Sequence, residues 1–559
     1  DGIPETTPDG QGQVDNLPLG LLGHLEVLRG PSGSLYGNAA GGVIYLETLD
    51  SLQGEAIRFR ATFGSYNYQN YQLTTQLGGE KTTALLHLNR TITEGYRNFS
   101  GLEQNVFNAK IMHVLSTRSR INFQINYTNS PKAEDAGGLK LEETEADFRQ
   151  ARQRNVEYNT FEKIDQFKIG TRWEYQWGSQ WDLDSYTFYS FRDFYGKLPF
   201  ENGGIVDLFR NYYGLGARLT YKEIHEKLTH RWQLGVERSS QRDQRDRFMN
   251  LKGTQGDNVF SQLEHFGNFG VSLLDELQWQ NVLIRTGLRY DYQTLGANTE
   301  QENQEYTVLN PSIGLSYAIA KHQRLFVNFS TSFETPTLSE LSANPSGGEG
   351  LNLNLNPSKA INYELGWKSQ NSAGYIETTA FYIQSSNEIL PYELEAFPGR
   401  SFYRNVGASR RYGLEVAANY QWDQWAFQAS LTQARYQFNQ ENDEGDLDGK
   451  SLPGIPNSQL FFQLDYTTSN NWKWVLSGEH IGRFYANNSN SVEINSIQKV
   501  LFQAQKTVVF SGGEFDFFGG INNLLNTTYY DNIRLNAFGG RFYEPAPGRN
   551  FYLGTRLNF

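Results

Sequence analysis

Arginine and aromatic side chains are mixed in two polar stretches of the chain, and this mixture is suited to holding a ligand. Guanidinium groups bind anions through several N–H donors and also stack on aromatic faces. A flat, anionic ligand fits such a surface. The residues that we predict to contact it are Arg192, Tyr195, Arg210, Tyr212 and Tyr213 in the first stretch, and Tyr392, Arg400, Tyr403 and Arg404 in the second. Aromatic residues that only anchor a protein at a membrane surface have the same appearance in sequence.

Other chemistry has little support in the sequence. The eight histidines lack the HxH or HExxH spacing of a metal site and cysteine is absent, so we predict no metal site. Few soft ligands are present for copper. The acidic loop 442–449 lacks the spaced carboxylates of an EF-hand, and we interpret it as a solvated loop rather than a calcium site. No GxSxG segment is present, and we predict that the protein is not an enzyme.

Composition and charge narrow the class of protein. The 559 residues carry a formal net charge of −12, which argues against nucleic acid as a partner, because phosphate binding needs a basic excess. Aromatic residues make up 14% of the chain. No run approaches the ~18 apolar residues of a membrane helix. A transmembrane β-barrel escapes that test, because only alternate residues of its strands face lipid, and its aromatic girdles account for the Tyr, Phe and Trp content.

Alternation with a period of two is the strongest local signal along the chain. Ile121, Phe123, Ile125 and Tyr127 share one face of a predicted strand, and the stretches 282–292, 325–331 and 460–466 repeat the pattern. Short turns alternate with long polar loops, which we expect at 129–160, 192–213, 239–262, 333–358, 385–409, 438–456 and 523–548. This asymmetry is typical of outer-membrane barrels, and roughly 22 strands of ~10 residues fit after the first 54 residues.

A glycine-punctuated segment precedes the first predicted strand. From Leu28 to Thr48 it reads LRGPSGSLYGNAAGGVIYLET, and it follows the stretch Asp1-Gly2-Ile3-Pro4. Glycines permit sharp turns and close approach to a wall, and no Lys-Ser/Thr follows to make a phosphate loop. The segment closely resembles the second half of the plug domain of TonB-dependent outer-membrane receptors. Further motifs of that family follow in order at 327–337, 362–368, 413–416, 453–457, 521–526 and 547–551.

The resemblance implies a fold and a function. The implied fold is an all-β membrane protein, in which a 22-stranded antiparallel transmembrane β-barrel at 55–559 encloses a partial N-terminal plug domain at 1–54. The implied function is import of a ferric siderophore or similar iron chelate, across the outer membrane of a Gram-negative bacterium, by a monomer that outer-membrane lipid surrounds. Iron is then carried by the substrate, and no cofactor is implied. We expect the segment that binds the TonB energy-coupling complex to lie upstream of Asp1.

Arg29 lies in the plug segment that must pack against the barrel wall, and a buried guanidinium needs a carboxylate partner. Alternation points Glu364 and Glu415 toward the lumen, because their strand neighbours are apolar or aromatic and face outward. In receptors of this kind, lumenal glutamates at these two motif positions hold plug arginines. We therefore predict that Arg29, Glu364 and Glu415 lock the plug to the barrel. A structural salt bridge that never changes during transport is the alternative.

The plug of this family carries an apical loop where the chain has Glu5 to Gln13. We predict that Gln11 and Gln13 contact the ligand there, with an ordinary solvated turn as the alternative. Two other functions stay open. One is TonB-dependent uptake of another substrate, such as cobalamin, an oligosaccharide or another metal chelate. The other is a passive porin or adhesin, which a naturally reduced plug favours.

Overall fold

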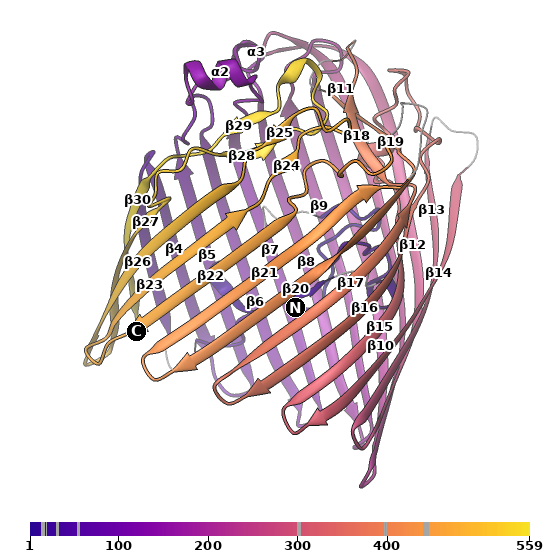
Figure 1. Cartoon of the computed structure of the whole chain (residues 1–559), viewed down its shortest axis with the longest axis vertical. Helices are drawn as coiled ribbons and strands as arrows, with labels where there is room; N and C mark the ends of the chain where they lie inside the picture. The colour runs from indigo at the N-terminus through magenta and orange to yellow at the C-terminus, as the bar shows by residue number, and fades with distance from the viewer. Residues whose placement is uncertain are drawn as a thin grey trace.

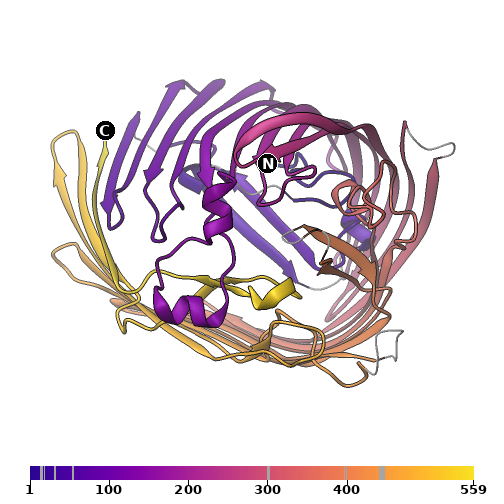
Figure 2. The ribbon, with the colours of Figure 1, turned by 90° about the horizontal axis from the view of Figure 1, so that it is seen from above.

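The computed structural model describes residues 1–12, 17, 19–29, 33–52, 56–298, 303–395, 397, 400–439 and 447–559. Within these residues, 22 antiparallel strands form one closed barrel, because the first barrel strand pairs with the last. Figure 1 shows the tilted strands from the side, and Figure 2 shows the amino-terminal segment inside the ring from above. The predicted fold class is confirmed. None of the helices that the structure describes is long and apolar enough to cross a membrane.

The barrel strands follow one another around the ring in chain order. They are β3 (Ile57–Gly64), β4 (Tyr68–Gly78), β5 (Thr82–Thr93), β6 (Leu102–Ser116), β7 (Ser119–Glu134), β8 (Phe161–Trp177), β9 (Trp181–Lys197), β10 (Ile205–Ile224), β11 (Leu228–Leu251), β12 (Thr254–Trp279), β13 (Val282–Ala297), β14 (Gln304–Ala320), β15 (Gln323–Glu334), β16 (Ser358–Asn371), β17 (Gly374–Ser386), β20 (Ala408–Trp422), β21 (Trp425–Phe438), β22 (Ser458–Thr467), β23 (Trp472–Ile481), β26 (Ile497–Phe510), β27 (Gly513–Asn522) and β30 (Asn550–Asn558).

The remaining elements lie inside the barrel or above its wide rim. Inside are η1 (Leu19–Leu21), β1 (Leu22–Arg29), α1 (Gly33–Tyr36) and β2 (Gly42–Thr48), and β1 pairs with β2. On the side of the long loops are α2 (Leu141–Ala146) and α3 (Gln153–Glu157), labelled at the top of Figure 1, together with α4 (Leu338–Leu341), η2 (Phe538–Gly540) and three small hairpins. These hairpins are β18 (Ile389–Glu393) with β19 (Ser401–Asn405), β24 (Phe484–Tyr485) with β25 (Glu493–Ile494), and β28 (Tyr530–Ile533) with β29 (Tyr543–Pro545).

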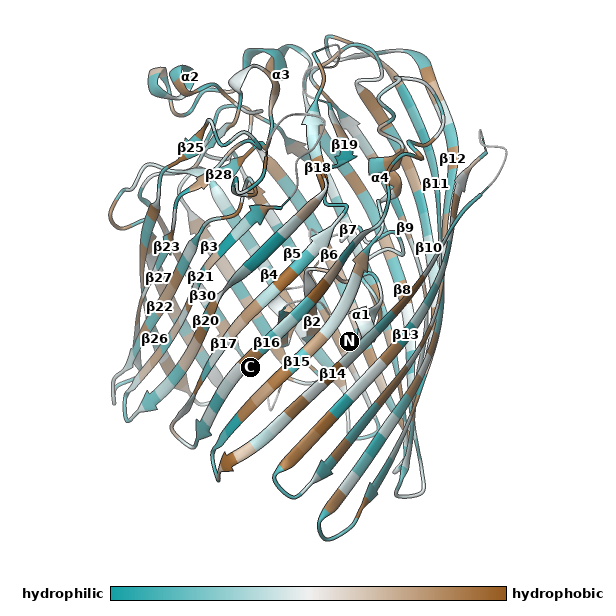
Figure 3. Ribbon diagram, turned by 45° about the vertical axis from the view of Figure 1, so that its right-hand side comes forward, coloured by the Kyte–Doolittle hydropathy of each residue, from teal (hydrophilic) through white to brown (hydrophobic). Residues whose placement is uncertain are grey.

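Burial alternates along the barrel strands, as a wall between lipid and a filled lumen requires. On β10, Arg210 and Tyr212 are 2% and 6% exposed, whereas the flanking Phe209 and Tyr213 are 42% and 39% exposed. Figure 3 shows the same alternation as brown and teal segments along each strand. Outward rings stack from strand to strand, as for Phe191 and Phe209, whose centroids are 5.9 Å apart. The outer surface is therefore the aromatic and apolar one.

Two predicted loops are wrong in extent. The structure has strands over most of 192–213, because β9 ends at Lys197 and β10 begins at Ile205. The stretch 239–262 is also strand, where β11 and β12 continue for 24 and 26 residues. About 10 residues suffice to cross the bilayer. These strands are therefore longer than a bilayer crossing requires, and the run of charged and amide residues at 241–247 hides the apolar alternation that marks a strand.

The plug segment is fixed to the lumen wall by charge and by close backbone approach. Lys110 of β6 forms an ion pair with Asp50 at 2.7 Å, and Lys168 of β8 forms one with Glu5 at 2.5 Å. At Gly33, an added Cβ would lie 3.0 Å from the Cα atom of Ser332. Glycine permits this contact because it has no side chain. The wall thus holds the plug at several points around its circumference.

The face assignment can be tested on two adjacent residues of β21. Leu431 faces lipid and is 37% exposed, whereas Ser430 faces the lumen. We expect Leu431→Arg to lower the free energy of unfolding by about 2–4 kcal/mol, because it places a charge in the hydrocarbon. Ser430→Arg, the matched control, should cost much less. Urea unfolding in phospholipid vesicles measures both, and equal losses would contradict the assignment.

Candidate functional site

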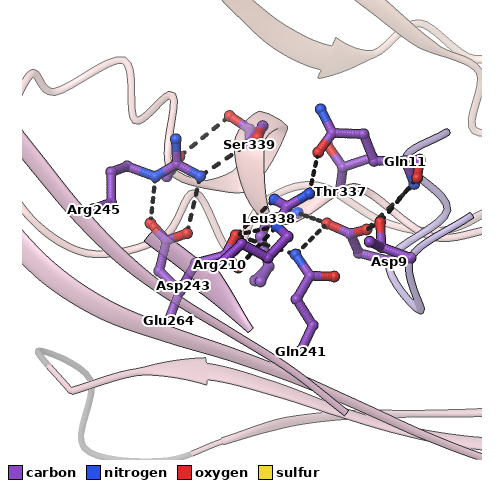
Figure 4. A network of polar contacts seen from close by, with 12 residues as sticks. Asp9, Gln11, Arg210, Gln241, Asp243, Arg245, Glu264, Thr337, Leu338 and Ser339 are labelled. Carbon is purple, nitrogen blue, oxygen red and sulfur yellow. Dashed lines mark hydrogen bonds and ion pairs between the residues drawn. The ribbon is translucent and has the colours of Figure 1, made fainter. Parts of the chain in front are cut away.

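Arg210 lies at the centre of a buried polar network between the barrel and the plug (Figure 4). Its Nε and Nη2 atoms donate to the carboxylate of Asp243 on β11, with a shortest distance of 2.6 Å, and Asp243 is fully buried. Its Nη1 atom donates to Gln11 Oε1 at 2.7 Å. All three guanidinium nitrogens are therefore engaged. Arg210 and Gln11, two predicted ligand contacts, therefore bind each other. Their contact holds residues 6–12 of the plug, called the plug turn below, against the barrel wall.

Tyr212 also holds the plug turn. Its hydroxyl donates to the carbonyl oxygen of Thr6 at 3.0 Å, and its ring packs edge-on against Phe188 at 4.7 Å. Arg192 is close by, where its Nη1 atom donates to Gln166 Oε1 at 2.7 Å. Arg192, Arg210 and Tyr212 line one narrow recess beneath the plug turn. The structure thus brings these three predicted residues together, at the junction of plug and barrel.

Asp9 joins three parts of the chain in this network and was missed in the sequence. Its Oδ1 atom accepts hydrogen bonds from Thr7 Oγ1 at 2.6 Å and from the Gln11 N–H at 3.2 Å. Its Oδ2 atom accepts from Gln241 Nε2 at 3.3 Å and from the Leu338 N–H at 2.9 Å. The carboxylate is fully buried. One plug residue therefore contacts the plug turn, strand β11 and helix α4.

A second group of charges lies on β11, β12 and the β18–β19 hairpin. Arg245 donates to Glu264 at 2.8 and 3.1 Å, and both are buried. Arg247 and Arg400 lie in the positive field of Arg245. Among the described residues, no carboxylate lies within ion-pair distance of Arg247 or Arg400. In the described part of the chain, Glu264 thus pairs with Arg245, and Arg245, Arg247 and Arg400 together are called the arginine group.

Arg400 is buried among aromatic rings and close to another cation. It is 9% exposed, and its guanidinium lies over the ring of Phe402 at 4.9 Å. Burial, followed by the charge of Arg245, lowers the pKa of Arg400 below its usual value. The Nε atoms of Arg247 and Arg400 are buried without a hydrogen-bond partner. An anion can satisfy such donors, so the arginine group is a candidate anion-binding position.

The other predicted residues of the second stretch lie on the same hairpin. Arg404 lies over the ring of Tyr392 at 4.5 Å, and Tyr403 packs against the apolar cluster that includes Leu338 and Leu341. Arginine and aromatic side chains are therefore adjacent here, as the sequence predicted. Arg245 and Arg247 were missed because their stretch was interpreted as a loop. The spacing of Asp243, Arg245 and Arg247 at every second residue was the signal that placed them on one strand face.

Two predicted ligand contacts are wrong. Tyr213 lies on the outer face of β10, and Tyr195 lies on the outer face of β9, where its hydroxyl donates to Gln255 Oε1 at 3.1 Å. Strand alternation turns both away from the lumen, and the error followed from interpreting 192–213 as a loop. Gln13 lies outside the described residues, as does 442–446 of the acidic loop. No metal-binding group of three or more His, Asp or Glu residues is present in the described part of the chain.

Arg29 forms its ion pair with Glu415, whose Oε2 atom lies 2.6 Å from Arg29 Nη1. A second carboxylate, Glu377 of β17, lies 3.7 Å from Arg29 Nη2 and was missed in the sequence. Glu364 is not a partner of Arg29, and instead accepts hydrogen bonds from Asn328 at 3.0 Å and Asn362 at 2.9 Å. The Arg29 side chain is 44% exposed. The pair is therefore partly solvated, and weaker than a fully buried one.

Comparison with known proteins identifies the family. The family model described as TonB dependent receptor-like, beta-barrel, matches residues 106–524, which is more than half of the chain. The chain therefore belongs to the TonB-dependent receptors. Members of this family are outer-membrane transporters and not enzymes, and their partners are chelated substrates and TonB. The predicted family and location are confirmed.

Solved structures show the same fold at low sequence identity. The unliganded ferric citrate transporter FecA is 20% identical, with a TM-score of 0.85, and the match covers 100% of this chain and 87% of that one. The ferric-catecholate import receptor Fiu from E. coli K12 is 16% identical, with a TM-score of 0.76, and covers 96% and 86%. The copper transporter OprC is 16% identical, with a TM-score of 0.78, and covers 100% and 89%.

The partners of Arg29 can be tested by double-mutant cycles. Since the ion pair with Glu415 is partly solvated, we expect a coupling free energy of roughly 0.5–1 kcal/mol between Arg29→Gln and Glu415→Gln. The cycle with Glu364→Gln should give a value near zero. The chain has no cysteine, so a single cysteine at Leu19, which is 70% exposed, can report plug unfolding in urea by thiol labelling. A larger coupling to Glu364 would contradict the structure.

The buried network makes a different prediction for Arg210. Arg210→Ala leaves the fully buried Asp243 without its cation, and we expect it to reduce the free energy of unfolding by about 3–5 kcal/mol. Tyr213→Ala, on the outer face of the same strand, serves as the control and should change stability by less. Denaturant unfolding of the purified protein measures both. Wild-type stability in Arg210→Ala would show that the network does not hold the plug turn.

Proposed function

We propose that this receptor imports an anionic ferric chelate, and that Arg247 and Arg400 bind it at the mouth of the barrel. The observation that carries the proposal is that the Nε atoms of Arg247 and Arg400 are buried donors without a hydrogen-bond partner. Among the described residues, the arginine group has one paired carboxylate, Glu264, and it binds Arg245. A buried donor without a partner is costly, and a charge-assisted hydrogen bond to an anion removes that cost.

The hairpin β18–β19 supplies the remaining contacts in this proposal. Tyr392, Tyr403 and Arg404 lie on it, together with the aromatic rings that flank Arg400. Such rings accept a planar chelate as well as a guanidinium group. Arg210, Tyr212 and Gln11 are assigned to fixing the plug turn, because their polar groups form contacts between the barrel and that turn. Arg192 is assigned to the barrel wall beside it, where it donates to Gln166.

Two solved structures with this fold are described as a ferric citrate transporter and a ferric-catecholate import receptor. Chelates of both kinds are anions, which agrees with an arginine site. In our proposal the iron belongs to the substrate, so the protein has no resident cofactor. Transport then requires movement of a plug that ion pairs hold in place, and the family's partner TonB is the proposed source of that work.

Equilibrium binding of ferric citrate, a ferric catecholate and a neutral ferric hydroxamate tests the proposal. We expect Arg247→Gln and Arg400→Gln each to weaken binding of an anionic chelate by roughly 10- to 100-fold, as expected for loss of a charge-assisted hydrogen bond. Affinity of the wild type should fall as salt rises. Arg242→Gln is the matched control, because Arg242 lies exposed on the opposite face of β11.

Two outcomes would contradict the proposed function. The first is unchanged affinity for both anionic chelates in Arg247→Gln and Arg400→Gln. The second is binding of the neutral hydroxamate with the same affinity and the same salt dependence as the anions. An equal loss in Arg242→Gln would show that net charge, rather than the arginine site, governs binding.

A further inference from the structure

The chain between β15 and β16 is joined to the plug at two successive points. The Asn38 side chain donates from Nδ2 to Thr335 Oγ1 at 2.9 Å, and its Oδ1 atom accepts the Thr335 N–H at 3.1 Å. Three residues further along, the Leu338 N–H donates to Asp9 Oδ2 at 2.9 Å. Asp9 and Asn38 come from different parts of the plug. This connection therefore ties the segment Thr335–Leu341 to the plug as a whole.

Helix α4 depends on the plug for part of its cap. Its first N–H groups have no partner within the helix, as in any helix. The Thr337 hydroxyl accepts the Glu340 N–H at 3.1 Å, and the Glu340 carboxylate accepts the Thr337 N–H at 2.8 Å. The Leu338 N–H, at the first position of the helix, is bound by Asp9. Withdrawal of Asp9 would leave a buried donor unpaired, so contact with the plug turn stabilises α4.

The opposite side of α4 packs against the proposed ligand hairpin. Leu338 and Leu341 are fully buried in a cluster with Phe266 and Leu295, and Tyr403 of β19 packs on that cluster. Arg400 directly precedes β19. In addition, Arg245 of the arginine group donates to Ser339 Oγ at 3.4 Å. Helix α4 therefore lies between the arginine group and the plug, in contact with both.

We propose that Thr335–Leu341 is a relay that couples the position of the β18–β19 hairpin to the plug turn, with Asp9 and Asn38 as its positioning residues. The proposed function supplies the direction of the signal, since an anion bound at Arg400 acts first on the hairpin. The hairpin moves α4 through the apolar cluster, and α4 moves the plug through Asp9 and Asn38. Coupling of this kind is reciprocal, so a change at the plug must also reach the hairpin.

Hydrogen–deuterium exchange of the ligand-free receptor in detergent tests the relay without any substrate. We expect Asp9→Asn, and separately Thr335→Val, to speed exchange about fivefold in 335–341 and also in 401–405, because each removes a fixed contact of the relay. In the opposite direction, Tyr403→Ala should speed exchange in the plug turn 6–12. Asp50→Asn is the control, since it breaks a plug–barrel ion pair with β6, whereas α4 contacts β12 and β19.

The outcome that overturns the relay is a local response. If Asp9→Asn changes only the plug turn, and Tyr403→Ala changes only the hairpin, the two sites are not coupled. A purely structural role for Asp9 predicts that one-sided result, whereas the relay predicts effects at both ends.

Saturation with ferric citrate, or with the ferric catecholate if that binds more tightly, then tests the direction of the signal. In the wild type we expect the chelate to alter exchange in 6–12, and in Asp9→Asn we expect it to bind while this distant response is lost. A full response in Asp9→Asn would overturn the relay. Absence of binding to the wild type would overturn the proposed function, and the ligand-free experiment would still decide the relay.

Discussion

The constraint on which the rest of the structure depends is that a backbone inside a bilayer must satisfy its own hydrogen bonds. Lipid offers no donor or acceptor, so a sheet can cross the membrane only if it has no free edge. Here β3, the first barrel strand, pairs with β30, the last one, and this pairing closes the ring. At this junction Arg58 lies opposite Asn558. Closure also fixes which face of every strand meets lipid and which meets the lumen.

A closed ring of this size encloses a wide lumen, and the polar residues that line it need partners. The plug supplies many of them. Lys110 pairs with Asp50, Lys168 with Glu5, and Arg29 with Glu415. Because these contacts are distributed around the wall, no single one holds the plug. The partial exposure of Arg29 also means that its ion pair can be broken at modest cost.

Near the mouth of the barrel, two arginines have a carboxylate partner and two have none among the described residues. Asp243 neutralises Arg210 and Glu264 neutralises Arg245, and in each case the geometry is bidentate or nearly so. Arg247 and Arg400 have no such partner among the described residues. The same physical rule, that a buried guanidinium needs an anion, therefore applies both to the plug contact of Arg210 and to the position that we propose for a ligand. The difference lies only in where the anion comes from.

The sequence by itself determined the barrel, its approximate strand number and the family, because period-two alternation, asymmetric turns and glycine-rich motifs are local features. It also identified the lumenal faces of Glu364 and Glu415, since alternation along one strand decides the face. It did not decide which carboxylate Arg29 meets, or that Glu377 lies beside it, because pairing across the lumen depends on the register of strands and on how the plug sits. Tyr195 and Tyr213 were misplaced, because the polar residues that surround them on β9 and β10 led to the interpretation of 192–213 as a loop. The roles of Asp9, Arg245 and Arg247 required the tertiary structure, which brings together residues as distant as Asp9, Gln241 and Leu338 and leaves some charges paired and others open.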